Sequence, residues 1–135
     1  MFNVQQNLKM KRVLIIDDCE ANLYLIKSVY EDDREITIDI ENNSKKALLS
    51  IKNKRPDMIL LDLMMPHIDG FQILLKLKAD IELCKIPIIV ISARQDKEAI
   101  EMAFEYGAID YIKKPVDIKE IKKKINNYFK KESAL

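Results

Sequence analysis

Residues 58–70 read MILLDLMMPHIDG, and this stretch carries the strongest indication of the fold. Met58–Leu61 is a short run of consecutive apolar residues, which favours a strand buried on both faces. The run stops at Asp62. Further along, Asp69 and Gln72 have the spacing of a helix N-cap followed by a polar partner at the third helical position. The segment therefore predicts a buried strand, a loop and a helix in succession.

The same alternation of short apolar runs with amphipathic segments extends along the chain. Strands are expected at Val13–Ile16, Ile36–Ile40, Met58–Leu61, Ile86–Ile91 and Ile109–Ile112. Helices, with apolar residues three and four apart, are expected at Cys19–Tyr30, Ser44–Asn53, Gly70–Ala79, Lys97–Tyr106 and Ile118–Phe129. Strict alternation predicts an α/β fold, a flavodoxin-like doubly wound sheet of five parallel strands in the order 2-1-3-4-5, with five helices in a three-layer sandwich. The second strand alternates apolar and polar residues, which is typical of a sheet edge.

Length and composition restrict the class of protein. The 135 residues suffice for one domain, expected at 10–130, with flexible ends at 1–9 and 131–135. Lys and Arg total 23 against 22 Asp and Glu, which argues against direct nucleic-acid binding. No apolar run is long enough for membrane insertion, and Cys19 and Cys84 follow no metal-ligand spacing. A cytoplasmic protein is expected.

Charged and polar residues follow the central strands at their carboxyl ends. In the predicted sheet these residues converge on one crevice: Asp17, Asp18, Asp62, Ser92, and Lys113 with Lys114. Three carboxylates crowded together repel one another, and a hard divalent cation allows all three to stay ionised. Three carboxylates and one lysine carry a charge of −2, which one Mg²⁺ neutralises. The sequence therefore predicts a magnesium site that can admit an anionic phosphoryl group.

The motifs around this crevice resemble those of a known family. They are Asp17-Asp18, Leu60 to Pro66 with Asp69-Gly70, Ile91-Ser92-Ala93 and Lys114-Pro115. Together they resemble the receiver domains of two-component response regulators, of the chemotaxis-regulator-like single-domain kind, over residues from about Lys11 to Tyr128.

The resemblance implies a chemistry for these residues. Asp62 would be the phosphoacceptor, taking a phosphoryl group from a partner histidine kinase or histidine phosphotransfer protein. Asp17, Asp18, Asp62 and the backbone carbonyl of Met64 would hold the Mg²⁺ cofactor. Lys114 and Ser92 would contact phosphoryl oxygens, and receivers of this kind have a cis peptide at the position of Lys114-Pro115. The protein would catalyse its own phosphorylation and dephosphorylation without being a conventional turnover enzyme.

The resemblance also implies a switch. Ser92 would move toward the phosphoryl group and Tyr111 would rotate inward, changing the surface from roughly Asp96 to Phe129. That surface would bind a downstream protein target and would also be the contact surface of a dimer. In the family, the positions of Met64 and Arg94 gate the attacking water, so an apolar Met64 and a cationic Arg94 predict a long-lived phosphoryl state.

Other functions remain open to different degrees. An aspartate-nucleophile phosphatase of the haloacid dehalogenase group would carry a second Asp two residues after the nucleophile, where this chain has Met64. A flavodoxin would need a phosphate-binding loop after the first strand, where Asp17-Asp18 would repel the flavin phosphate. A pseudo-receiver that acts as a protein-interaction module without phosphorylation stays possible. The chain also fits a receiver fragment of a larger regulator or hybrid kinase.

Overall fold

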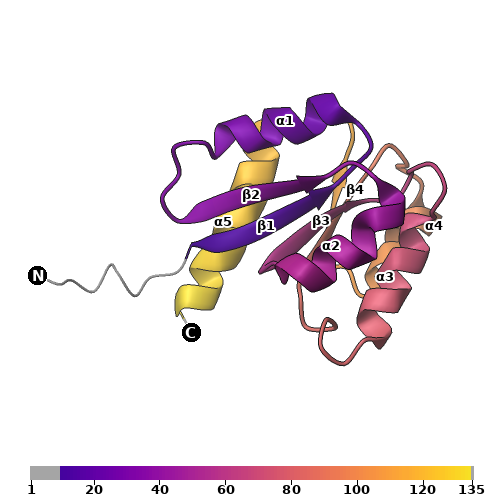
Figure 1. Cartoon of the computed structure of the whole chain (residues 1–135). Coiled ribbons are helices and arrows are strands. Elements are labelled where there is room, and N and C mark those ends of the chain that lie inside the picture. Colours follow the sequence, from indigo (N-terminus) through magenta and orange to yellow (C-terminus); the bar gives the residue numbers. More distant parts are fainter. Residues whose placement is uncertain (1–9, 135) are drawn as a thin grey trace, which may run out of the picture.

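The structure is a computed structural model that describes residues 10–134 as an α/β sandwich (Figure 1). Its strands are β1 (Lys11–Ile16), β2 (Ile36–Glu41), β3 (Met58–Asp62), β4 (Ile88–Ser92) and β5 (Asp110–Lys113). Its helices are α1 (Glu20–Val29), the 3-10 turn η2 (Ser44–Lys46), α2 (Ala47–Lys54), α3 (Gly70–Ala79), α4 (Lys97–Glu105) and α5 (Ile118–Ala134). The strands are all parallel, in the order β2-β1-β3-β4-β5. The predicted fold class and strand order are confirmed.

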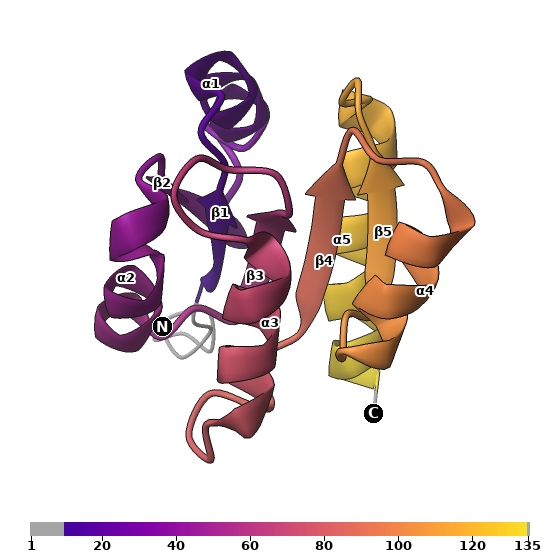
Figure 2. The ribbon, with the colours of Figure 1, turned by 90° about the vertical axis from the view of Figure 1, so that its right-hand side faces the viewer.

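The helices form two layers, one on each face of the sheet (Figures 1 and 2). Helices α1 and α5 cover one face, and α2, α3 and α4 cover the other. Neighbouring residues along a strand point to opposite faces, so Leu14 and Leu61 pack with the α2–α4 layer, whereas Ile15 and Leu60 pack with α1 and α5. This explains why β1, β3 and β4 are apolar at consecutive positions.

Several element boundaries differ from the predicted ones for local reasons. The fourth strand starts at Ile88 instead of Ile86, because the N–H of Ile86 bonds the carbonyl of Leu83 in a turn and Pro87 has no N–H to donate. The second helix begins with η2, because Asn43 caps the N–H of Lys45 and tightens the first turn. The strand predicted from Ile109 starts one residue later, at Asp110.

Helix α5 extends past residue 130, where the domain was expected to end. Residues 131–134 were expected in a flexible end, but α5 runs as a continuous helix through Ala134. Ile121, Ile125 and Phe129 recur four residues apart and anchor the helix to the sheet, so the apolar stripe holds the last turns in register. The other expected flexible end, 1–9, lies outside the described residues. Within residues 10–134, no helix is both long and apolar enough to cross a bilayer.

Candidate functional site

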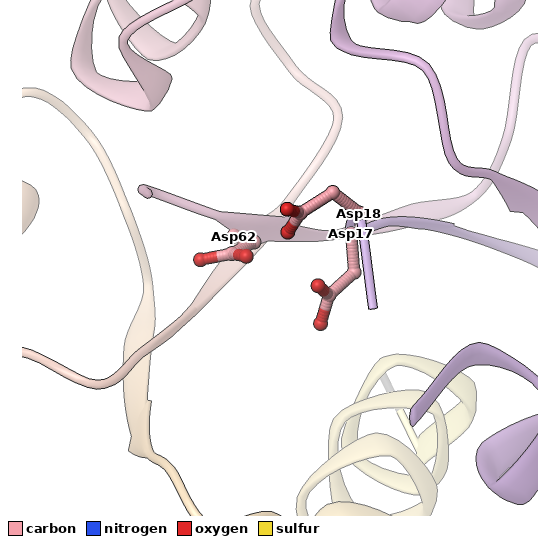
Figure 3. A group of neighbouring side chains, drawn as sticks. All are labelled: Asp17, Asp18 and Asp62. Carbon is pink, nitrogen blue, oxygen red and sulfur yellow. The ribbon is translucent and has the colours of Figure 1, made fainter. Parts of the chain in front are cut away.

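Three carboxylates meet at the carboxyl edge of the sheet, where β1 and β3 end side by side (Figure 3). The register pairs Ile16 of β1 with Leu61 of β3, so Asp17 and Asp62 follow directly at the same level. One oxygen from each of Asp17, Asp18 and Asp62 lies within 4.8 Å of the others. Asp17 and Asp62 are buried, whereas Asp18 is exposed to solvent. The predicted acidic cluster is therefore assembled, with one carboxylate open to solvent.

Lys114 reaches this cluster from the end of β5. Its Nζ lies 3.2 Å from Asp62 Oδ2 and donates a hydrogen bond to Asp17 Oδ1 at 3.2 Å. The Lys114-Pro115 peptide is cis, as predicted. A single ammonium thus faces two buried carboxylates.

The electrostatics of Asp62 follow from burial and crowding. Burial raises the pKa of Asp62 to about 7, and the neighbouring charge of Asp17 adds to the shift. The N–H of Met64, which donates to Asp62 Oδ1 at 3.0 Å, and the charge of Lys114 lower that pKa and limit the rise. Burial lowers the pKa of Lys114, but the charges of Asp62 and Asp17 outweigh it and keep the pKa above the usual lysine value. One lysine therefore compensates the buried carboxylates only in part.

The residues fit a hard divalent cation. Within residues 10–134, Asp17 Oδ2 is a buried side-chain oxygen without a hydrogen-bond partner. It lies 3.1 Å from Lys114 Nζ, close enough for an ion pair but without the angles of a hydrogen bond. A buried carboxylate oxygen without a hydrogen bond needs another polar or cationic partner. Carboxylate oxygens are the ligands that Mg²⁺ prefers, so a bound Mg²⁺ would be such a partner.

Comparison with known proteins identifies the family. The model of the response regulator receiver domain matches residues 13–126. This chain belongs to that family. Receiver domains generally bind Mg²⁺ at an acidic pocket, and this receiver has an acidic cluster of Asp17, Asp18 and Asp62 at the carboxyl edge of its sheet.

Relatives and solved structures agree with this assignment. The receiver is 32% identical to Protein PilH of Pseudomonas aeruginosa over 117 residues, which are 87% of this chain and 96% of PilH. It is 33% identical to the response regulator ArlR of Staphylococcus epidermidis over 91% of this chain, but it spans only 54% of ArlR. The CheY-like receiver domain of Methanospirillum hungatei superimposes with a TM-score of 0.83 at 25% identity, covering 93% of this chain and 98% of that one. The receiver domain of the Francisella response regulator 1452 gives 0.81 at 30% identity, covering 90% and 98%.

The remaining predicted site residues of this receiver lie on the neighbouring strands. Ser92 ends β4, is fully buried, and its hydroxyl accepts a hydrogen bond from the N–H of Arg94 at 3.1 Å. Tyr111 points inward toward the α4 layer, and its hydroxyl donates to the carbonyl of Arg94 at 2.8 Å. The loop after β4 is therefore bonded at Arg94 to both residues that the resemblance makes switch elements.

Arg94 lies in an arrangement that the sequence did not predict. Its guanidinium forms two hydrogen bonds with Asp96, at 3.0 Å from Nε and 2.8 Å from Nη2. Asp96 also caps α4 by accepting the N–H of Ala99 at 3.1 Å. The expected role of Arg94 at the phosphoryl group would require it to leave this pair. Asp96 was not singled out, although an aspartate just before a helical pattern is a recognisable N-cap signal.

The loop after β3 holds the backbone of Met64 beside the acidic cluster. The Met64 side chain is 56% exposed, while its N–H bonds Asp62 as described above. A Cβ placed on Gly70 would come within 2.5 Å of Leu63 Cα and 2.7 Å of Asp62 O, so only glycine lets α3 start this close to the site. The role of Gly70 in packing was not predicted from the motif.

Proposed function

We propose that this receiver is phosphorylated on Asp62 by a histidine kinase or histidine phosphotransfer protein in a Mg²⁺-dependent reaction. The observation that supports it most is the meeting of three carboxylates within 4.8 Å, with Lys114 Nζ 3.2 Å from Asp62 Oδ2. A nucleophilic carboxylate, a fixed cation and a divalent-ion site are the components that phosphoryl transfer needs.

In the proposed step, a carboxylate oxygen of Asp62 attacks phosphorus and forms an O–P bond. The P–N bond of the donor phosphohistidine breaks, and its imidazole leaves with the electron pair. Bound Mg²⁺ supplies positive charge that offsets the negative charge of the transferring group. Lys114 holds one phosphoryl oxygen, Ser92 donates its hydroxyl to another, and Asp17, Asp18 and the Met64 carbonyl complete the ion site. Later attack by water returns free Asp62 and inorganic phosphate.

The switch would pass through the loop after β4. A phosphoryl group adds nearly two negative charges beside Ser92, and any movement of Ser92 shifts the backbone of Arg94. Because Tyr111 is bonded to that carbonyl, the shift changes the packing of Tyr111 against α4. The surface formed by α4, β5 and α5 is therefore the surface to which a downstream protein, or a second copy in a dimer, would bind.

The test is phosphorylation by a small acyl phosphate with and without Mg²⁺, followed by intact mass. We expect the mass gain of one phosphoryl group in the wild type with Mg²⁺, and none after chelation or in Asp62→Asn. An unmodified wild type under these conditions, and with a panel of histidine kinases, would support a pseudo-receiver instead. Whether the endogenous product is about as long as this chain, as PilH is, or is a longer regulator, as ArlR is, is decided by measuring its length.

A further inference from the structure

Ser44 is a buried polar residue outside the acidic cluster. Within residues 10–134, the buried polar or charged side chains are Asp17, Asp62, Ser92 and Ser44. The first three belong to the candidate site, whereas Ser44 begins η2, in the connection between β2 and α2. Its side chain is only 4% exposed, and its hydroxyl donates a hydrogen bond to the carbonyl of Pro66 at 2.5 Å. The connection after β2 is therefore bonded to the loop after β3.

The loop after β3, residues 63–69, leads directly from the proposed phosphoacceptor to α3. Its backbone contacts the site, because the N–H of Met64 donates to Asp62 Oδ1 at 3.0 Å. The path of the loop therefore sets the orientation of the Asp62 carboxylate. It also sets the position of the Met64 carbonyl, which the proposed function makes a Mg²⁺ ligand.

This loop contains a backbone conformation that needs support. His67 has a φ of +75°, in the left-handed region that residues other than glycine seldom adopt. Its side chain is exposed, so burial of the imidazole does not offset the strain. The Pro66 carbonyl that accepts the Ser44 hydroxyl belongs to the peptide unit just before His67. The hydrogen bond from Ser44 therefore holds the strained peptide in place.

A hollow of about 390 Å³ lies where the two connections face each other beside the acidic cluster. Residues of both connections line it together with Asp18, namely Asn42, Asn43, Ser44, Lys45, Pro66 and His67. Across the described part of the chain, the bond from Ser44 to Pro66 is the one hydrogen bond that joins residues 42–46 to residues 63–69. Without this bond, the loop has no polar contact on the side of the hollow.

The connection that carries Ser44 is itself held in place. The N–H of Asn43 donates to Glu41 Oε2 at 3.0 Å, and the Asn43 side chain accepts the N–H of Lys45 at 2.9 Å. Ala47, directly after η2, is fully buried in the core between the sheet and the α2–α4 layer. Ser44 therefore extends from a fixed base toward the strained loop.

We propose that Ser44 is a positioning residue, which holds the loop after β3 in the geometry that binds Mg²⁺ beside Asp62. This inference rests on the proposed function, because it concerns the same ion. Ser44 acts indirectly, through the Pro66 carbonyl. When the hydroxyl is removed, the turn at His67 relaxes and the Met64 carbonyl leaves its ligand position. The loss falls on the affinity for Mg²⁺ and not on phosphoryl transfer once the ion is bound.

The test compares Ser44→Ala with Ser50→Ala, a matched control. Ser50 lies on α2, and its hydroxyl donates to Glu41 instead of the loop after β3. The affinity for Mg²⁺ is obtained from the gain in the free energy of unfolding with Mg²⁺ concentration, measured in urea, so basal stability is recorded for each variant. We expect Ser44→Ala to weaken Mg²⁺ binding about fivefold, equivalent to about 1 kcal/mol, and Ser50→Ala to weaken it less than about twofold.

Phosphorylation by a small acyl phosphate separates positioning from a general loss of structure. In Ser44→Ala, the Mg²⁺ concentration that gives half of the maximal rate should rise about fivefold, while the maximal rate at saturating Mg²⁺ stays within about twofold of the wild type. Ser44→Cys has a side chain of similar size but only a weak donor, so it should weaken Mg²⁺ binding by an intermediate amount, about twofold. It replaces Ser44→Ala if the alanine variant unfolds.

The outcomes distinguish this inference from the proposed function. Unchanged Mg²⁺ affinity in the Ser44 variants, or equal losses in Ser44→Ala and Ser50→Ala, would overturn the positioning role alone. A lower maximal rate with an unchanged half-saturating Mg²⁺ concentration would also overturn it. A wild type that binds no Mg²⁺ would overturn the proposed function together with this inference.

Discussion

The two ends of β3 differ in what surrounds them. Met58 to Leu61 are fully buried among apolar side chains from both helical layers, so each atom there contributes to stability. Asp62, the next residue, is equally enclosed at 2% exposure but sits among carboxylates, with one lysine to compensate them. The core end is optimised for burial, whereas the carboxyl end retains a buried charge whose pKa is raised to about 7. The contrast indicates that the carboxyl end of β3 is not optimised for stability, as the proposed chemical role of Asp62 would require.

The largest effect should come from the core end. Leu60→Ala removes a fully buried side chain beneath the α1 and α5 layer and should lower the free energy of unfolding by about 3 kcal/mol. Urea denaturation followed by circular dichroism measures this, with the exposed Leu49→Ala as the control, expected to change stability by under about 0.5 kcal/mol. Similar losses in both variants would contradict the assignment of Leu60 to a tightly packed core.

At the carboxyl end of β3, a substitution should raise the free energy of unfolding instead of lowering it. Without Mg²⁺ at pH 7, Asp62→Asn should be more stable than the wild type by about 2 kcal/mol, because a pKa raised from 3.8 to about 7 makes ionised Asp62 unfavourable in the folded state. The upper bound of about 4 kcal/mol is reduced by solvent screening, because Asp18 in the same cluster is exposed to water.

The pH dependence sharpens this test. The folded protein binds the Asp62 proton more tightly than the unfolded chain does. The contribution of protonated Asp62 to the free energy of unfolding is therefore fully present below pH 4 and is lost as the pH rises to about 7. The advantage of Asp62→Asn should therefore shrink as pH falls toward 4. An advantage that stays constant between pH 4 and 7 would show that it does not come from ionisation of Asp62.

Adding Mg²⁺ should stabilise the acidic carboxyl end of β3 and so reduce the difference in stability contribution between the two ends of the strand. At ten times the dissociation constant, Mg²⁺ should stabilise the wild type by about 1.4 kcal/mol. Asp18→Ala should lose most of this gain at little cost in basal stability, because Asp18 is exposed. Thermal unfolding against Mg²⁺ concentration measures the effect, and Asp32→Ala, an exposed carboxylate outside the cluster, is the control. Unchanged Mg²⁺ affinity in Asp18→Ala would exclude the proposed ion site.

The smallest effect concerns the phosphoryl lifetime. Met64→Asn should speed dephosphorylation a few-fold, equivalent to under about 1 kcal/mol in the barrier, because an amide can position water where methionine cannot. Phosphate release after removal of the donor measures the rate.

The combined variant Met64→Asn, Arg94→Glu should lose its phosphoryl group faster than Met64→Asn alone if Arg94 shields that group. Arg94→Glu also replaces the partner of Asp96 with a second carboxylate, so its effect on α4 must be checked by thermal unfolding. Equal or slower decay in Met64→Asn would remove the idea that this position controls water.

The sequence predicted much of this protein because several signals were local. Apolar runs predicted the central strands, and the residues directly after β1 and β3 reached the carboxyl edge because parallel strands end together. The positions of Asp17, Asp62 and Lys114 in one cluster follow from that topology alone. The family motifs supplied what spacing could not, including the cis peptide before Pro115.

Only the tertiary structure decided how the side chains are paired and how far the last helix extends. The pairing of Arg94 with Asp96 depends on the path of a loop that has no periodic pattern. Asp17 Oδ2 is left without a hydrogen bond because of the angle at which Lys114 Nζ approaches it, since their distance of 3.1 Å alone would allow one. Periodicity and capping involve residues that are close together in the chain, so they can be predicted from the sequence. Pairings across long sequence separations depend on the whole packed structure, so only the fold fixes them.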